Sequence, residues 1–150
     1  MYPKKFFDPD PPKPLNGRCF VIMPFAEKFD EVYATIKETV EADEVGFICL
    51  RADDISSSGY VMEDVLKKIG ESEIIIADLT ERNPNVFYEL GIVHMVKDAN
   101  KVIMLAQDIE AVPFDLRPFR CIVYKQTLST GQKIDNSSQL KTFSFACLVA

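Results

Sequence analysis

Residues 73–106 decide the fold and read EIIIADLTERNPNVFYELGIVHMVKDANKVIMLA. The run EIIIA at 73–77 has almost no polar alternation, which is typical of a strand covered on both faces of a parallel sheet. Pro84 suits the first position of a helix, and the apolar stretch after it predicts a helix over 84–97. The run KVIMLA at 101–106 predicts the next strand, so the stretch forms one strand–helix–strand unit.

The same two patterns continue on both sides of this unit. Apolar runs and helical spacing predict strands at 18–24, 47–50 and 119–124, and helices at 28–43 and 62–70. Strands that alternate with helices indicate a parallel sheet with right-handed crossovers. The predicted fold is an α/β, Rossmann-like (flavodoxin-like) three-layer sandwich. It has a five-stranded parallel sheet, for which the order 2-1-3-4-5 is favoured.

The chain divides into three parts. Residues 1–17 hold five of the nine prolines, which favours an extended N-terminal arm. Residues 18–124 form the α/β domain. Residues 125–150 form a C-terminal tail, which could contain a last helix that closes the domain.

Composition excludes several classes of protein. The chain has 150 residues, of which 47% are hydrophobic, which matches one globular domain with a packed core. Its net charge is -6 and it has no Lys/Arg cluster, so nucleic-acid binding is not expected. It has neither the apolar run of a signal peptide nor that of a membrane helix, so we expect a cytoplasmic protein without a membrane partner.

Metal and cofactor signatures are also missing from the sequence. Cys19, Cys49, Cys121 and Cys147 form no CxxC pair, and His94 is the only histidine. Free thiols and no metal site are therefore predicted. The absence of a GxGxxG or Walker loop disfavours dinucleotide dehydrogenases and P-loop NTPases, and no cofactor is expected.

The predicted site lies at the carboxyl ends of the first and third strands, where the winding of an open sheet reverses. Met23, Pro24 and Phe25 follow the first strand, and Asp78 follows the third. Asp78 could accept hydrogen bonds from a sugar hydroxyl, or it could be a turn residue that binds nearby amides. Its position alone leaves both alternatives open.

Glu89 is the only charge between residues 86 and 96, on a helix that is apolar all round and is therefore predicted to be buried. Burial of an unpaired carboxylate costs several kcal/mol, so such a group has a raised pKa or a function. With Asn83 as N-cap, Glu89 lies too deep to act as a capping residue. The alternative is a structural ion pair with Arg51 or Arg82.

Four further residues complete the predicted substrate site. Of Asn83 and Asn85, one is expected to cap the helix and the other to point into the crevice. Arg51 and Asp53 begin the polar loop after the second strand.

Three stretches resemble the nucleoside 2-deoxyribosyltransferase-like group, which is related to bacterial TIR-like domains. They are FVIMPF at 20–25, IIIADLTERNPNVFYELGIVH at 74–94 and VPFDLRPFRCIVY at 112–124. The resemblance covers about residues 18–124. It implies an enzyme that cleaves or transfers an N-glycosidic bond of a nucleoside or nucleotide.

The resemblance also assigns roles within the predicted site. It implies that Glu89 acts on the anomeric carbon, that Asp78 serves the ribose or base pocket, and that residues 23–25 form the pocket wall. One alternative is a TIR-like hydrolase with NAD as substrate, in which Arg51, Arg82 or Lys28 would meet the pyrophosphate. A non-catalytic nucleotide sensor or interaction domain is another, and a homo-oligomer stays open beside a monomer.

Overall fold

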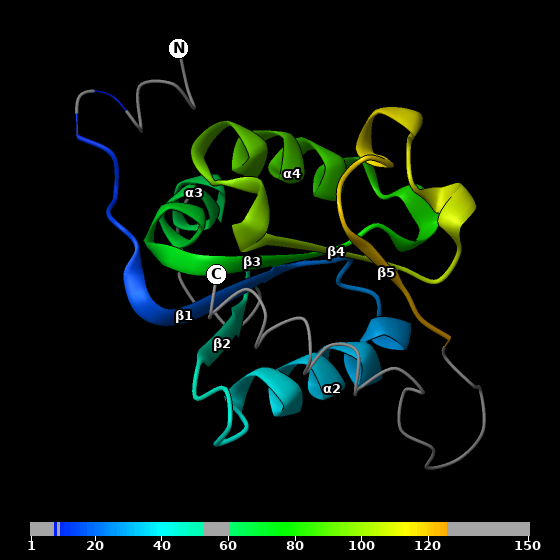
Figure 1. Cartoon of the computed structure of the whole chain (residues 1–150), viewed down its shortest axis with the longest axis horizontal. Helices are drawn as coiled ribbons and strands as arrows, with labels where there is room; N and C mark the ends of the chain where they lie inside the picture. The colour runs from blue at the N-terminus through cyan, green and yellow to red at the C-terminus, as the bar shows by residue number, and fades with distance from the viewer. Residues whose placement is uncertain (1–7, 9, 53–60, 126–150) are drawn as a thin grey trace.

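Five strands form one parallel sheet in the order β2-β1-β3-β4-β5, as the sequence predicted (Figure 1). The structure is a computed structural model and describes residues 8, 10–52 and 61–125. The predicted tail at 125–150 lies outside this part of the chain apart from Lys125. The strands are β1 (Leu15–Ile22), β2 (Ile48–Arg51), β3 (Ser72–Asp78), β4 (Val102–Ala106) and β5 (Cys121–Val123).

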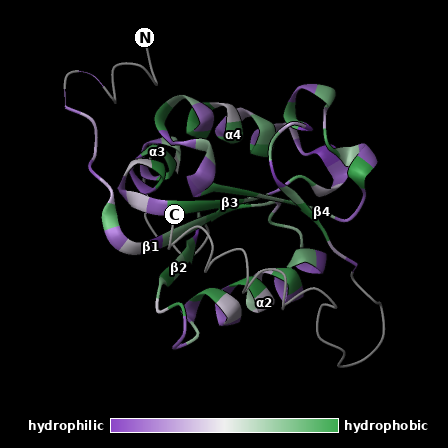
Figure 2. Ribbon diagram, viewed as in Figure 1, coloured by the Kyte–Doolittle hydropathy of each residue, from purple (hydrophilic) through white to green (hydrophobic). Residues whose placement is uncertain are grey.

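Helices cover both faces of the sheet and complete the predicted three layers. Helix α2 (Asp30–Glu41) lies on one face, and α3 (Val61–Glu71) and α4 (Pro84–Val96) lie on the other (Figure 1). Side chains alternate along a strand, so Ile74 and Ile76 join the core under α2 while Ile75 and Ala77 join the core under α3 and α4. The ribbons of the central strands β3 and β4 are accordingly mostly coloured as hydrophobic (Figure 2).

Strand β1 begins inside the segment that the sequence assigned to the extended arm. Leu15 is already paired with Ser72 of β3, and the Gly17 amide donates a hydrogen bond of 2.9 Å to Glu73 Oε2. Gly17 has a φ of 74°, which the irregular register between Leu15 and Cys19 requires and glycine adopts without strain. The strand ends at Ile22 rather than at 24, because Pro24 has no amide to donate.

The prediction that α4 is buried on all sides is wrong. Val86, Leu90 and Val93 pack against the sheet, but Tyr88 is 52% exposed and Met95 is 85% exposed. The helix belongs to an outer layer of the sandwich, so only one of its sides reaches the sheet. The lack of charged residues in a helix does not show that other segments cover all of its sides.

The cysteines lie in the strands that the sequence assigned to them. Cys19 and Cys49 are buried, Cys121 is half-buried, and all three are free thiols. Cys147 lies outside the described residues. Within the described ranges, no helix combines the length and the apolar character that a membrane crossing requires.

Candidate functional site

Two cavities open at the carboxyl edge of the sheet. Because β1 and β3 are neighbours, the segments that follow them meet at this edge, which is where open parallel sheets bind ligands. We call the smaller cavity, about 50 Å³, the Glu89 cavity, and the larger, about 560 Å³, the Lys28 cavity.

The Glu89 cavity collects most of the residues that the sequence predicted for the site. Its lining contains Met23, Pro24, Phe25, Asn83, Asn85 and Glu89, together with Val21, Ile22, Ala52 and Val86. Glu89 is the one charged side chain among these described lining residues. Small-molecule sites usually enclose about 300–1,000 Å³, so this cavity can take only part of a ligand.

Burial dominates the electrostatics of Glu89. It raises the pKa of the carboxyl from 4.5 to about 7. The predicted ion-pair partners are engaged elsewhere, since Arg51 pairs with Asp30 at 3.3 Å and Arg82 donates to the Glu110 carbonyl. Among the residues that the structure describes, no ion pair involves Glu89. The structural ion pair is therefore not observed.

This pKa makes the stability of the domain depend on pH. Between pH 4.5 and about 7 the folded state keeps the Glu89 proton and the unfolded state loses it, so stability falls as pH rises. Glu89→Gln removes this penalty and should stabilise the domain above pH 7, by at most about 3 kcal/mol. Near pH 4 the two proteins should be equally stable.

Urea denaturation at about pH 4, 6 and 8 measures this difference. Glu63→Gln, on the exposed side of α3, is the matched control and should show no such trend. A Glu89→Gln protein that is less stable than the wild type at pH 8 would mean that the carboxylate has a stabilising partner.

The sequence could not say which of the two asparagines caps α4, and the structure gives that role to Asn83. Asn83 is the N-cap of α4, because its side-chain oxygen accepts a hydrogen bond of 2.9 Å from the Asn85 amide, and Pro84 follows at the first helical position. Asn85 is exposed and lines the Glu89 cavity. The cap fixes where α4 starts and hence where Glu89, about one and a half turns later, meets the cavity.

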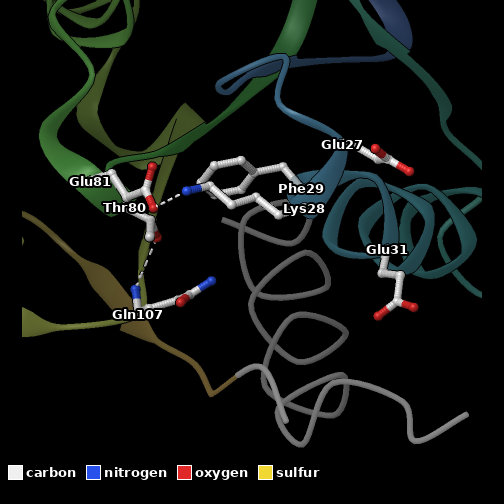
Figure 3. A pocket seen from close by; sticks show the side chains of 7 residues that line it. All are labelled: Glu27, Lys28, Phe29, Glu31, Thr80, Glu81 and Gln107. Atoms are coloured by element: carbon white, nitrogen blue, oxygen red, sulfur yellow. Dashed lines mark hydrogen bonds and ion pairs between the residues drawn. The ribbon is translucent and has the colours of Figure 1, made fainter. Parts of the chain in front are cut away.

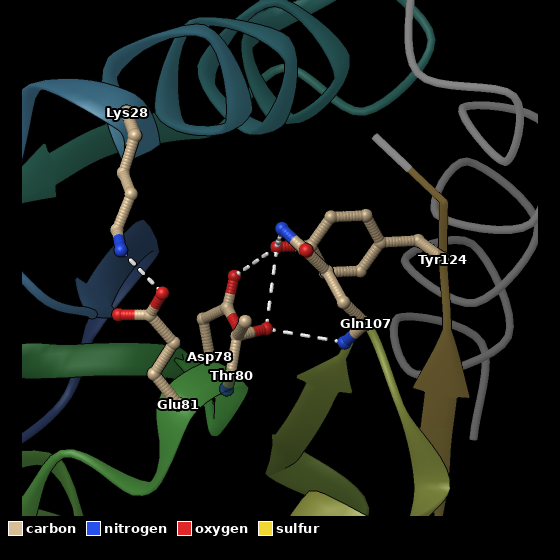
Figure 4. A network of polar contacts seen from close by, with 6 residues as sticks. All are labelled: Lys28, Asp78, Thr80, Glu81, Gln107 and Tyr124. Carbon is tan, nitrogen blue, oxygen red and sulfur yellow. Dashed lines mark hydrogen bonds and ion pairs between the residues drawn. The ribbon is translucent and has the colours of Figure 1, made fainter. Parts of the chain in front are cut away.

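Asp78 has both carboxylate oxygens engaged inside the protein (Figure 4). Tyr124 donates a hydrogen bond of 2.6 Å to Oδ2, and the Thr80 hydroxyl and amide donate to Oδ1 at 2.5 and 3.0 Å. Gln107 extends the network, because its side-chain amide donates to the Tyr124 hydroxyl at 3.2 Å. Burial raises the pKa of Asp78, and the hydrogen bonds from Thr80 and Tyr124 oppose that rise.

The structure separates Asp78 from Glu89, although the sequence placed them at one site. Asp78 lines neither of the two cavities. Ala77 belongs to the core under α4, so the next residue along β3 points to the opposite face, toward α2. Of the two alternatives for Asp78, the geometry matches an internal turn residue, since it accepts the Thr80 amide.

Arg51 lies next to Met23 and Phe25, which line the Glu89 cavity, but it is not itself in the lining. Its side chain is only 8% exposed. The guanidinium sits 4.3 Å from the centre of the Tyr33 ring and 5.9 Å from that of Phe25, within the range of cation–π contacts. It thereby supports Phe25, a wall of the cavity. Asp53, the remaining predicted residue, lies outside the described part of the chain.

The Lys28 cavity, whose lining side chains Figure 3 shows, was not predicted from the sequence. Its volume of about 560 Å³ suits a small ligand. Its lining comes from the segments after β1, β3 and β4 and contains Glu27, Lys28, Phe29, Glu31, Thr80, Glu81 and Gln107. Lys28 forms an ion pair with Glu81 across it. No cluster of acidic, histidine or cysteine side chains in the described residues could hold a metal ion.

The chain reverses between the two cavities at Glu81 and Arg82. Their φ angles, 65° and 52°, are left-handed, which costs non-glycine residues of the order of 1 kcal/mol each. Thr80 precedes the reversal and lines the Lys28 cavity, while Asn83 follows it and lines the Glu89 cavity. Backbone strain of this kind concentrates at functional sites.

Comparison with known proteins gives a likeness in structure only. No protein-family model and no curated protein matches the sequence. The 2-deoxyribosyltransferase of the psychrotolerant bacterium Bacillus psychrosaccharolyticus has a TM-score of 0.63 and 12% identity, over 87% of this chain and 95% of that chain. The likeness is one of fold. It shows that this chain has a flavodoxin-like parallel sheet, and it does not assign the activity of that transferase to this chain.

Two larger proteins contain a similar unit. A mutant flavo di-iron protein from Thermotoga maritima has a TM-score of 0.52 and 18% identity, over 91% of this chain and 36% of its own. Rubredoxin oxygen:oxidoreductase from Desulfovibrio gigas has a TM-score of 0.56 and 15% identity, over 92% and 38%. This chain therefore spans little more than a third of either protein.

Proposed function

We propose that this chain cleaves or transfers the N-glycosidic bond of a nucleoside or nucleotide, with Glu89 acting at the anomeric carbon. The observation that supports this proposal most strongly is the environment of Glu89. Its half-buried carboxyl has a pKa of about 7 and lines a cavity at the carboxyl edge of the sheet. The fold shared with a 2-deoxyribosyltransferase supports the same chemistry. Displaced pKa values in a cleft are a common mark of catalytic groups.

The chemistry requires one carboxylate and a space for the sugar. As the bond between the anomeric carbon and the base nitrogen breaks, the bonding electrons leave with the base, which takes up a proton from solvent. Positive charge then develops on the sugar. Ionised Glu89 stabilises this charge or bonds to the anomeric carbon to form a glycosyl ester. Water in hydrolysis, or a second base in transfer, then bonds to the anomeric carbon and gives a proton to solvent, which frees the Glu89 carboxylate.

The size of the Glu89 cavity sets how a substrate would lie. Because about 50 Å³ cannot enclose a nucleoside, only the edge of the sugar would enter, and the base would lie at the mouth. Phe25 is 60% exposed there and offers an aromatic face for stacking. Asn85 is exposed and lines the same cavity, so its side-chain amide would bind sugar hydroxyls in this proposal. Asp78 would act indirectly, by holding the segment after β3 in place.

NAD is the less favoured substrate because the described cations at this edge are occupied. Lys28 pairs with Glu81, and Arg82 donates to the Glu110 carbonyl. Glu27 and Glu31 add negative charge to the neighbouring cavity. A pyrophosphate would therefore meet repulsion there.

Chromatography of free base tests the proposal directly. We expect the full chain to release base from deoxynucleosides or nucleoside monophosphates, and to form a new nucleoside when a second base is present if it is a transferase. Release of nicotinamide from NAD alone would select the TIR-like alternative. If no base appears from any of these substrates while the protein binds them in calorimetry, the domain is a sensor and the proposed function is wrong.

A further inference from the structure

Arg51 is the one buried cation among the residues that the structure describes. It is the last residue of β2. Removing a guanidinium from water is unfavourable unless other groups pair with it, and a hydrophobic residue of similar volume often serves stability as well or better. The contacts of the guanidinium therefore indicate its role.

The guanidinium reaches the segment after β1, which contributes to the lining of the Glu89 cavity. Arg51 is paired in register with Val21, so its side chain starts near the carboxyl end of β1. A guanidinium nitrogen lies 3.9 Å from Met23 Sδ, and the guanidinium carbon lies 5.9 Å from the centre of the Phe25 ring. Both of these residues line the cavity. Arg51 thus contacts the cavity wall without being in the lining itself.

Helix α2 holds the guanidinium in this position. The centre of the Tyr33 ring lies 4.3 Å from the guanidinium carbon, and Asp30 Oδ1 lies 3.3 Å from a guanidinium nitrogen. A planar guanidinium can stack on aromatic rings while it hydrogen-bonds a carboxylate, which the ammonium of lysine does less well. Arg51 therefore links Phe25 to a helix of the sandwich.

Phe25 is the part of the cavity wall that most needs such a link. Its side chain is 60% exposed, and exposed side chains change rotamer within nanoseconds. A ring that is already held in place loses less conformational entropy when a ligand binds, so the affinity for the ligand is higher.

We propose that Arg51 is a positioning residue, which holds the Phe25 ring in the orientation in which a nucleobase stacks on it. The choice of a nucleobase as the ligand rests on the proposed function. Arg51 acts through Phe25 and not through the charge of Glu89, since burial is the cause of the raised Glu89 pKa. The rate of base release should therefore keep its pH dependence when Arg51 is replaced.

NMR relaxation of the phenylalanine ring carbons in the full chain tests the link without a ligand. We expect the Phe25 ring to be more ordered than that of Phe114, which is 82% exposed. Arg51→Met keeps an unbranched stem and removes the guanidinium, so the Phe25 ring should become as mobile as the Phe114 ring. Folding should survive because Asp30 is 58% exposed and water can solvate its carboxylate. A wild-type Phe25 ring as mobile as that of Phe114 overturns the proposal.

Calorimetry with the four deoxynucleosides tests the effect on binding, in a Glu89→Gln background that prevents turnover. We expect Phe25→Ala and Arg51→Met each to weaken binding about tenfold, the scale of one base stacked on an aromatic ring. The two changes together should weaken binding no further than Phe25→Ala alone. Arg18→Met is the matched control, because this arginine of β1 pairs with Glu71 and lines neither cavity, and its loss should leave binding unchanged.

Two outcomes of the binding experiment would overturn the proposal. Losses that add in the double variant would mean that Arg51 does not act through Phe25. An Arg51→Met chain that loses kcat in proportion to its unfolded fraction, with KM unchanged, would show a purely structural role. Base release decides the proposed function separately. Ring order can be measured in a chain that cleaves nothing, and a chain that cleaves nucleosides can have a mobile Phe25.

Discussion

Replacing Glu89 by glutamine should lower the rate of base release at least about 100-fold while the domain stays folded. Glutamine keeps the volume of the side chain and removes the charge that would meet the developing cation. The loss of such a group raises the barrier by about 3 kcal/mol or more. Folding should survive because no ion pair among the described residues depends on the carboxylate.

Two further comparisons test this assignment. The Glu63→Gln control should keep wild-type turnover, since Glu63 lies on the exposed side of α3. The wild-type rate should rise with pH through about 7 as Glu89 ionises, and the residual rate of Glu89→Gln should lack that step. Wild-type turnover in a folded Glu89→Gln protein would remove Glu89 from the mechanism.

Asp78→Ala should be the most destabilising single substitution at this edge of the sheet, with a loss of about 3–5 kcal/mol in the free energy of unfolding. Asp78 is fully buried and accepts hydrogen bonds from Thr80 and Tyr124. Without the carboxylate, these donors would be left unpaired in the interior, which costs more than the net value of the bonds.

Chemical denaturation with two matched variants checks this expectation. Asp115→Ala, at an exposed position, should change stability by less than about 0.5 kcal/mol. Tyr124→Phe removes one donor and should cost less than Asp78→Ala. If Asp78→Ala kept its stability but bound substrate more weakly, Asp78 would be a ligand-binding residue, as the alternative from the sequence holds.

The sequence predicted the sheet because its signals are local. The alternation of apolar runs and helical spacing requires no knowledge of distant contacts, and right-handed crossovers then limit the strand order. The N-cap at Asn83 was one of two local alternatives. The exposure of Met95 was predicted wrongly, because the layer that covers a helix depends on segments elsewhere in the chain.

The site was harder to predict for the same reason. Asp78 and Tyr124 are 46 positions apart, and no pattern in either stretch indicates their hydrogen bond. The side of β3 on which Asp78 lies could have been predicted, because Ala77 and Asp78 must point in opposite directions. The charged stretch around Lys28, just past the first strand, was a usable signal for the larger cavity. Gln107, the first polar residue after β4, was another.

The lengths of the two edge strands affect how readily this protein can aggregate through its sheet. The edge strands are the shortest, with four residues in β2 and three in β5, while β1 in the interior has eight. An open edge can recruit strands from other molecules and grow into fibres, and short edges offer few hydrogen bonds for that growth. The two edges of the described sheet therefore offer little template for the growth of fibres.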